Sequence, residues 1–213
     1  MTSVPMSGRK AQAARNDELI LQAARAVFTA DPGAPIASVA ERAGVGISAL
    51  YRRYPSKEAL LQKLCFDGLT LYIAAAEKAM ADQGDPWEAF ATYMREIVDA
   101  DTHSLTIALA GTFQPTEELY QAATRASDLA IQVHGKASGA GVLRQDITVS
   151  DVALLFEQLA SVKLGDHGRT DQLRHRYLAL VLDSLRLPPD KRPLPGPPPE
   201  DAELRARWAP GSA

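Results

Sequence analysis

Apolar residues recur every three or four positions along most of this 213-residue chain, which is the spacing of one face of an α-helix. No stretch sustains the strict alternation of apolar and polar residues that marks a β-strand. The pattern therefore predicts an all-α protein. The expected helices cover residues 16–29, 35–43, 47–54, 56–82, 86–101, 103–112, 115–136, 151–164 and 170–187, with a flexible break at 137–141.

The first two short helices are joined by a glycine turn. Pro35 suits the first position of a helix, where the backbone N–H has no helical partner in any case. Apolar residues follow at helical spacing up to Ala43, and Gly44 can then adopt the left-handed conformation that ends a helix. A second short helix stops at Pro55, and Ser56 caps the longer helix that follows.

The second short helix carries side chains that suit DNA recognition. Leu50 can face the first short helix, while hydroxyl and guanidinium groups on the other faces can bond phosphates and base edges. Two short helices at a tight turn place such a recognition helix in the major groove. The alternative is a helical hairpin that only packs. The residues expected at DNA are Ile47, Ser48, Ala49, Tyr51, Arg52, Arg53 and Lys57.

The helix expected over 16–29 precedes this hairpin and presents one apolar face, with Ile20, Ala24 and Phe28 among its members. Such a face can form the core of a three-helix unit. We therefore expect a DNA-binding domain with a helix-turn-helix over residues 14–55, followed by a larger helical domain over residues 56–187.

Three motifs in this order resemble the TetR family of transcriptional regulators. They are Ala43-Gly44-Val45 at the turn, Leu50-Tyr51-Arg52-Arg53-Tyr54 at the end of the recognition helix, and Ser56-Lys57-Glu58-Ala59-Leu60-Leu61 at the next helix start. The resemblance covers about residues 16–66. It implies DNA binding by a dimer. By their position and chemistry, Tyr51, Arg53 and Lys57 are expected to contact phosphates.

The chain departs from the family pattern at two pairs of residues. Ser48-Ala49 stands where the family usually has Gly-Thr, and Arg53-Tyr54 replaces a His-Phe pair. Arg53 keeps a phosphate donor and makes it permanently charged, while Tyr54 keeps the aromatic packing. Ser48-Ala49 therefore bears on which operator sequence is read.

The last expected helix is apolar on two faces, so one face needs a partner outside its own domain. Together with the helix before it, it could form a four-helix interface about a two-fold axis, an arrangement that the resemblance also implies. The alternative is a monomer that buries both helices internally. The residues expected at the dimer interface are Val152, Leu155, Leu159, Tyr177, Leu180, Val181 and Ser184.

The resemblance also implies a pocket for a small-molecule effector in the C-terminal domain. Its candidate wall residues are large and mostly apolar, which favours an apolar effector, although the same residues could be ordinary core. His103 next to Asp101 could be a polar contact of the pocket or could start a helix. The candidate wall residues are Tyr72, Trp87, Phe90, Met94, Phe113 and Phe156.

Charge is distributed unevenly along the chain. The formal net charge is −3, which alone argues against a nucleic-acid partner. Residues 1–60, however, hold 8 Lys and Arg against 5 Asp and Glu, whereas the remainder holds 15 against 21. The basic excess therefore lies with the predicted DNA-binding domain.

Several classes of site are missing from the sequence. It shows no nucleophile elbow, phosphate loop or dinucleotide fingerprint, and its four histidines lack metal-binding spacing. We therefore expect no enzyme, no metal and no cofactor. The single cysteine, Cys65, excludes an intrachain disulfide and is expected to be a buried small side chain.

The two ends of the chain differ from its middle. Residues 1–13 are polar and are expected to be a disordered arm, whose Arg9 and Lys10 could reach DNA or only aid solubility. Residues 188–213 form a proline-rich tail. No apolar run has membrane-spanning length and no signal peptide is visible, so we expect a cytoplasmic protein that does not bind membranes.

The sequence thus predicts a repressor that binds a palindromic operator as a homodimer and is released by a small apolar effector. Two alternatives remain open. One is a helical small-molecule-binding protein or enzyme that uses the C-terminal cavity. The other is a structural helical dimer whose N-terminal hairpin has no function in DNA binding.

Overall fold

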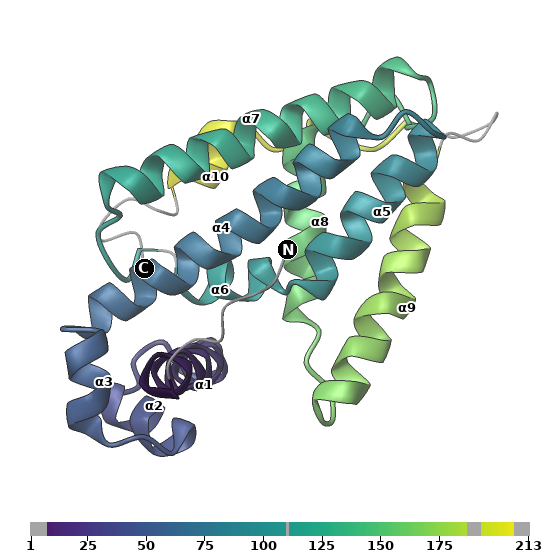
Figure 1. Cartoon of the computed structure of the whole chain (residues 1–213). Coiled ribbons are helices and arrows are strands. Elements are labelled where there is room, and N and C mark those ends of the chain that lie inside the picture. Colours follow the sequence, from purple (N-terminus) through teal and green to yellow (C-terminus); the bar gives the residue numbers. More distant parts are fainter. Residues whose placement is uncertain (1–7, 110, 187–192, 207–213) are drawn as a thin grey trace.

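A computed structural model describes residues 8–109, 111–186 and 193–206 of the chain (Figure 1). Within these ranges the structure is helical, and the only β-type pairing is an isolated bridge between Leu143 and Arg186. This confirms the all-α class. The helices are α1 (Gly8–Ala30), α2 (Ile36–Ala43), α3 (Ile47–Arg53), α4 (Lys57–Ala81), α5 (Pro86–Asp99), α6 (Thr102–Leu109), α7 (Glu117–Gly139), α8 (Val149–Ser161), α9 (His167–Leu185) and α10 (Asp201–Ala206).

The N-terminal helices α1, α2 and α3 surround a small core of their own. Phe28 from α1, Val39 from α2 and Leu50 from α3 are completely buried in one apolar cluster. Gly44 ends α2 with φ 64°, a left-handed conformation that glycine adopts without steric cost. The predicted hairpin of two short helices at a glycine turn is therefore confirmed.

Helix α4 links the two parts of the molecule. Ser56 caps it, because its hydroxyl oxygen accepts a hydrogen bond from the N–H of Ala59 at 3.0 Å. The first turns of α4 belong to the N-terminal core through Leu60 and Leu64, and α6 adds Leu105 and Leu109 to the same core. The N-terminal core therefore extends past residue 55, where the sequence placed the domain boundary.

The C-terminal helices form a second core around the rest of α4. Figure 1 shows α7, α4 and α5 running side by side, with α8 behind them and α9 at one edge. Helix α4 packs against α5, α6 and α7, while α9 packs against α5 and α8. Phe90, Met94, Ile97 and Phe156 are among the buried side chains at the centre of this core.

Several helix ends differ from those expected, and the N-terminal arm, the break at 137–141 and the tail are the regions most affected. Helix α1 already begins at Gly8, so the arm expected over residues 1–13 is helical from that point; residues 1–7 lie outside the described ranges. Helix α7 continues through the break expected at 137–141 to Gly139, because Ala137 is buried and the Lys136 ammonium donates to carbonyls at the end of α4. A short helix, α10, lies in the tail.

Helix α4 is long and apolar enough to cross a membrane by length and composition alone. A core helix of a folded domain meets the same criterion. In this structure α4 packs against α5, α6 and α7, and a third of its apolar window is buried inside the chain.

Candidate DNA interface and effector site

Helix α3 presents a mixed polar and apolar outer face. Ile47 and Tyr51 are 41% and 46% exposed. Ser48 and Arg52 are exposed beside them, whereas Ala49 is partly buried. Leu50 points inward and is completely buried, as predicted. The outer face is therefore free for a partner while the inner face anchors the helix.

A salt bridge fixes the end of α3 to α1. The Arg53 guanidinium donates two hydrogen bonds to the Asp17 carboxylate, at 2.7 and 2.9 Å, and the Tyr54 hydroxyl donates a third at 2.7 Å. The hydrogen bond from Arg53 lowers the pKa of Asp17 below its usual value, so the carboxylate stays ionised. This arrangement joins the end of α3 to α1 and leaves the Arg53 side chain 58% exposed.

Lys57 has a different environment from the one expected. Its ammonium donates hydrogen bonds to the carbonyl oxygens of Pro32 and Ala34, at 2.7 and 2.8 Å, and lies over the ring of Phe28. These contacts close the loop between α1 and α2. Because two of its three N–H donors are satisfied internally, the structure supports a structural role for Lys57 rather than the expected phosphate contact.

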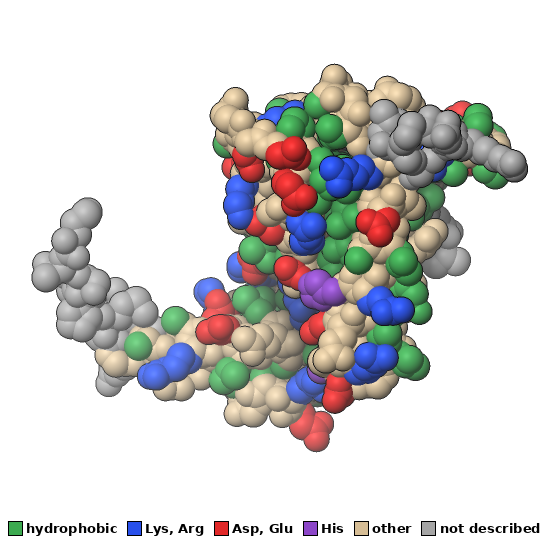
Figure 2. Space-filling model, turned by 90° about the vertical axis from the view of Figure 1, so that its right-hand side faces the viewer, with side chains coloured by type: hydrophobic (Ala, Val, Ile, Leu, Met, Phe, Trp, Pro, Cys, Tyr) green, Lys and Arg blue, Asp and Glu red, His purple; other side chains and the backbone are tan. Residues whose placement is uncertain are grey.

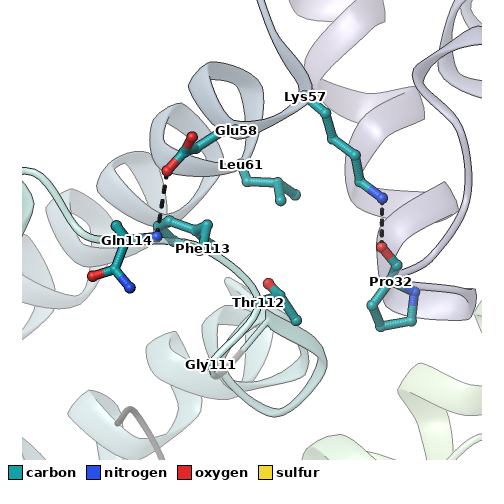
Figure 3. A pocket seen from close by; sticks show the side chains of 8 residues that line it. All are labelled: Pro32, Lys57, Glu58, Leu61, Gly111, Thr112, Phe113 and Gln114. Atoms are coloured by element: carbon teal, nitrogen blue, oxygen red, sulfur yellow. Dashed lines mark hydrogen bonds between the residues drawn. The ribbon is translucent and has the colours of Figure 1, made fainter. Parts of the chain in front are cut away.

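An open hollow of about 440 Å³ lies where the N-terminal and C-terminal parts meet. Figure 3 shows Lys57 and Glu58 reaching from the start of α4 toward Pro32 on one side and Gln114 on the other. The backbone N–H of Gln114 donates to Glu58, and Phe113 lines the hollow beside it. Phe113 is therefore far from the effector pocket in which the sequence placed it, because it packs with the N-terminal core.

The other predicted pocket residues do come together in the C-terminal core. Trp87, Phe90, Met94 and Phe156 are buried in one cluster, and Tyr72 packs against it. In this structure these side chains pack together as part of the C-terminal core. A hollow lined by Phe156 and residues of α5, α6, α8 and α9 has a volume of about 10 Å³, roughly the space of one water molecule.

Polar tips of aromatic side chains gather beside that small hollow. The hydroxyls of Tyr72 and Tyr93 are hydrogen-bonded to each other. The His103 ring stacks on Phe156 with its centroid 4.8 Å away, and burial lowers the pKa of His103 to about 4. His103 is therefore neutral at physiological pH, and its Nδ1 lies 3.2 Å from the Thr102 hydroxyl.

The outward face of α9 carries exposed apolar residues. Tyr177 and Leu180 are 45% and 57% exposed, Ser184 is exposed and Val181 is partly buried. Leu178, by contrast, is buried inside the chain. In Figure 2 one part of the molecule projects to the left, and hydrophobic side chains (green) lie along the opposite, right-hand edge.

Two residues expected at the dimer interface are in the core instead. Val152 and Leu159 on α8 are 5% and 3% exposed and belong to the C-terminal cluster. They lie on the inner face of α8, which packs against α5, α6 and α7. Leu155 is partly buried and is left as the α8 candidate among the predicted residues.

Sequence reasoning missed the residues whose partners are distant in the chain. Asp17 bonds Arg53 across 36 positions, and Arg174 bonds Asp101 across 73. Tyr93 was also missed, although its place three residues after Phe90 on an amphipathic helix put it near the predicted pocket.

Family comparisons place both parts of the chain among known regulators. Residues 20–64 match the family model described as bacterial regulatory proteins, tetR family. Residues 85–187 match the model of the C-terminal domain of SbtR-like transcriptional regulators. No curated protein sequence matches the chain significantly.

Solved structures share this fold over nearly their whole length. A TetR transcription regulatory protein from Mycobacterium vanbaalenii is 27% identical with a TM-score of 0.55, and the match covers 84% of this chain and 99% of that one. SCO0520 from Streptomyces coelicolor is 24% identical with a TM-score of 0.54, covering 79% and 97%. LfrR from Mycobacterium smegmatis, solved in complex with proflavine, is 21% identical with a TM-score of 0.53, covering 78% and 95%.

Proposed function

Because the chain belongs to the TetR family of bacterial regulatory proteins, we propose that it is a repressor that binds a palindromic DNA operator as a homodimer and responds to a small-molecule effector. The observation that carries this proposal is the outer face of α3. Ile47, Ser48, Tyr51 and Arg52 are exposed on a helix whose inner face is fixed by Leu50.

The residues of α3 would divide between two kinds of DNA contact. Ile47, Ser48 and Ala49, at the start of the helix, would meet base edges, because the N-terminal residues of a recognition helix reach deepest into the major groove. Tyr51, Arg52 and Arg53 would contact phosphates, which position the helix without reading sequence.

The dimer would form through the outward face of α9. An exposed Tyr177 and Leu180, with Val181 between them and the core, form an apolar surface that association would remove from water. A two-fold dimer presents two copies of α3, and these would read the two halves of a palindrome.

The effector would bind in the C-terminal core beside Tyr72, Tyr93 and His103. The surrounding side chains favour a mostly apolar molecule, and the three polar tips would bond one polar group on it. LfrR, a protein of the same fold, was solved with proflavine, which supports small-molecule binding by this architecture. Because the present core is closed, binding would require its helices to separate.

Separation of those helices would release DNA. Helix α4 contributes to both cores, so a shift of its C-terminal half would tilt the N-terminal helices and change the spacing of the two α3 helices. In this proposal the protein is a regulator without enzymatic activity that acts in the cytoplasm.

An electrophoretic mobility shift with the DNA upstream of the chain's own coding sequence tests this function. We expect retardation of that DNA at concentrations that leave an unrelated duplex free. The variant Arg52→Gln should weaken the shift, whereas Arg125→Gln, which removes an exposed arginine on α7, should not. Equal binding to both duplexes, or no binding to either, would count against the proposal.

A further inference from the structure

The corner between α5 and α6 has an unusual backbone. Asp101 has φ 48°, and within the described ranges it is the only residue other than glycine with a positive φ. Such a conformation is strained for a residue with a Cβ and persists when the surroundings hold it in place. Two arginines from different parts of the molecule hold this corner.

The first arginine comes from the N-terminal domain. Arg25 on α1 donates from one guanidinium nitrogen to the carbonyl oxygens of Ala100 and Asp101, at 3.2 and 3.3 Å. Close by, the Lys163 ammonium from the α8–α9 connection donates to the carbonyl of Thr29 at 3.0 Å. The C-terminal half of α1 is thus bonded to the C-terminal domain at two points.

The second arginine comes from α9. Arg174 is only 6% exposed and donates to the Asp101 carboxylate at 2.8 Å and to the Ser104 hydroxyl at 3.2 Å. It also donates to the carbonyl oxygens of Ala160 and Val162, at 2.7 and 3.3 Å, where α8 ends. One buried guanidinium therefore joins the corner to both of the last two long helices.

Helix α1 carries this connection to the DNA-binding face. Its Asp17 holds Arg53 and Tyr54 at the end of α3, two turns away from Arg25 on the same helix. The path from α9 to α3 thus runs through Arg174, Asp101, Arg25 and α1, without passing through α4.

We propose that Arg25, Asp101 and Arg174 form a polar link that fixes α1 to α8 and α9 and so sets the orientation of α3 relative to the dimer-forming helices. The three act as positioning residues for α3 and are not placed at DNA, although Asp101 and Arg174 also line the small hollow beside His103. Only the purpose of the link, the orientation of α3 for DNA, rests on the proposed function. The hydrogen bonds that connect α1 to α8 and α9 are present in the folded chain whatever its function.

Hydrogen–deuterium exchange of the full-length protein without DNA or effector tests the link. Arg174→Lys keeps the charge but loses the planar fork of donors. We expect amides of residues 20–30 in α1 to exchange about tenfold faster in this variant, as for members of one coupled network. Arg125→Gln, which removes an exposed ion pair with Glu77, is the matched control and should leave α1 unchanged.

The reciprocal experiment uses the milder variant Arg25→Gln. Coupling between two sites is reciprocal, so this change on α1 should speed exchange where α8 ends and α9 begins. If Arg174→Lys fails to fold, the exchange measurement on Arg25→Gln alone tests the proposed link. The proposal is overturned if α1 is unchanged in Arg174→Lys or if the α8–α9 region is unchanged in Arg25→Gln.

A DNA measurement separates this link from the DNA contacts. With a duplex recovered by selection from a random pool, Arg25→Gln should weaken binding while the log–log salt dependence stays as in the wild type, because no phosphate contact is lost. A reduced salt slope would make Arg25 a DNA contact and would overturn its role as a positioning residue. Failure to recover any duplex would contradict the proposed function and leave the exchange result standing.

Discussion

At the scale of single residues, Asp17 determines how α3 is presented. Its carboxylate accepts two hydrogen bonds from Arg53 and one from Tyr54, so the end of α3 is bonded to α1. Arg53 therefore has two roles, since it holds the helix and also keeps an exposed positive charge at its end.

The two roles of Arg53 can be separated with a matched pair of variants. Arg53→Gln removes the charge, so it should weaken binding to all DNA sequences and lower the log–log salt slope by about one unit. Asp17→Asn frees the guanidinium but keeps its charge, so the slope should stay unchanged. The measurement is DNA affinity as a function of salt; an unchanged slope in Arg53→Gln would remove Arg53 from the interface.

His103 makes stability depend on pH. Burial lowers its pKa from 6.5 to about 4, so the unfolded chain binds a proton that the folded chain excludes between these values. Stability should therefore fall as pH falls through this window, by about 3 kcal/mol in total from this group. Denaturant unfolding at several pH values would measure the loss.

The variant His103→Gln does not titrate and should lose this part of the pH dependence. His175→Gln is the control, because the pKa of His175 is raised by its hydrogen bond to the Asp171 carbonyl and by Asp99. Its contribution is therefore present at low pH and disappears as pH rises. An unaltered slope between pH 6.5 and pH 5 in His103→Gln would contradict the burial of a neutral histidine.

Which residues of α3 are exposed and which are buried could be predicted from the sequence, but the partners of their neighbours could not. Exposed Tyr51 and Arg52 and buried Leu50 follow from helical spacing. The Asp17–Arg53 pair and the contacts of Lys57 with Pro32 and Ala34 depend on how α1 packs across the hairpin. No local pattern in the sequence carries that information.

At the scale of elements, α9 has two apolar faces, of which one is buried inside the chain and the other is exposed. Leu178, Leu182 and Leu185 are buried inside the chain, whereas Tyr177 and Leu180 are exposed. The sequence identified both faces from periodicity. It placed Val152 and Leu159 of α8 on the wrong side, because periodicity shows that a face is apolar but not which neighbour covers it.

The exposed face of α9 predicts the effect of a charge on assembly. Leu180→Arg should leave the monomer folded, since the side chain is already exposed, but should cost several kcal/mol in the dimer by burying an unpaired charge. Sedimentation at micromolar concentration should therefore show a monomer. Ile131→Arg, at a similarly exposed site on α7, should remain dimeric. A monomeric wild-type protein would contradict this interface.

Helix ends show where local signals suffice. The starts of α4 and α5 were predicted because Ser56 and the Asp85-Pro86 pair are strong local signals, and the structure shows both caps. The end of α7 was predicted too early, since Gly139 and Gly141 suggested a break. Contacts of Ala137 and Lys136 with other helices hold that last turn.

At the scale of the whole molecule, two cores share helices. Helix α4 contributes to both, and α6 places Leu105 and Leu109 in the N-terminal core although it follows α5 in the chain. Helices α1, α2 and α3 are therefore not an independent module on a linker. A rearrangement of the C-terminal core that moves α4 should therefore also change the packing of the N-terminal core.

This shared architecture predicts reciprocal coupling between effector and DNA. An effector that releases DNA must bind the DNA-free form better, so operator DNA should weaken effector binding by the same factor, a coupling of roughly 1–3 kcal/mol. Calorimetric titration of a ligand found by screening, with and without operator duplex, would measure it. Equal affinities in the two titrations would mean that this ligand is not the inducer.

The central claim is that a dimer of this chain reads DNA with α3, and selection of bound duplexes from a random pool tests it most directly. We predict enrichment of a palindrome whose half-sites lie about one helical turn, or a multiple of it, apart. Ser48→Ala and Ile47→Ala should shift the base preference within each half-site. Two results would contradict the assignment of α3 as the recognition helix. One is failure to enrich any sequence, and the other is that both variants select the same sequence as the wild type.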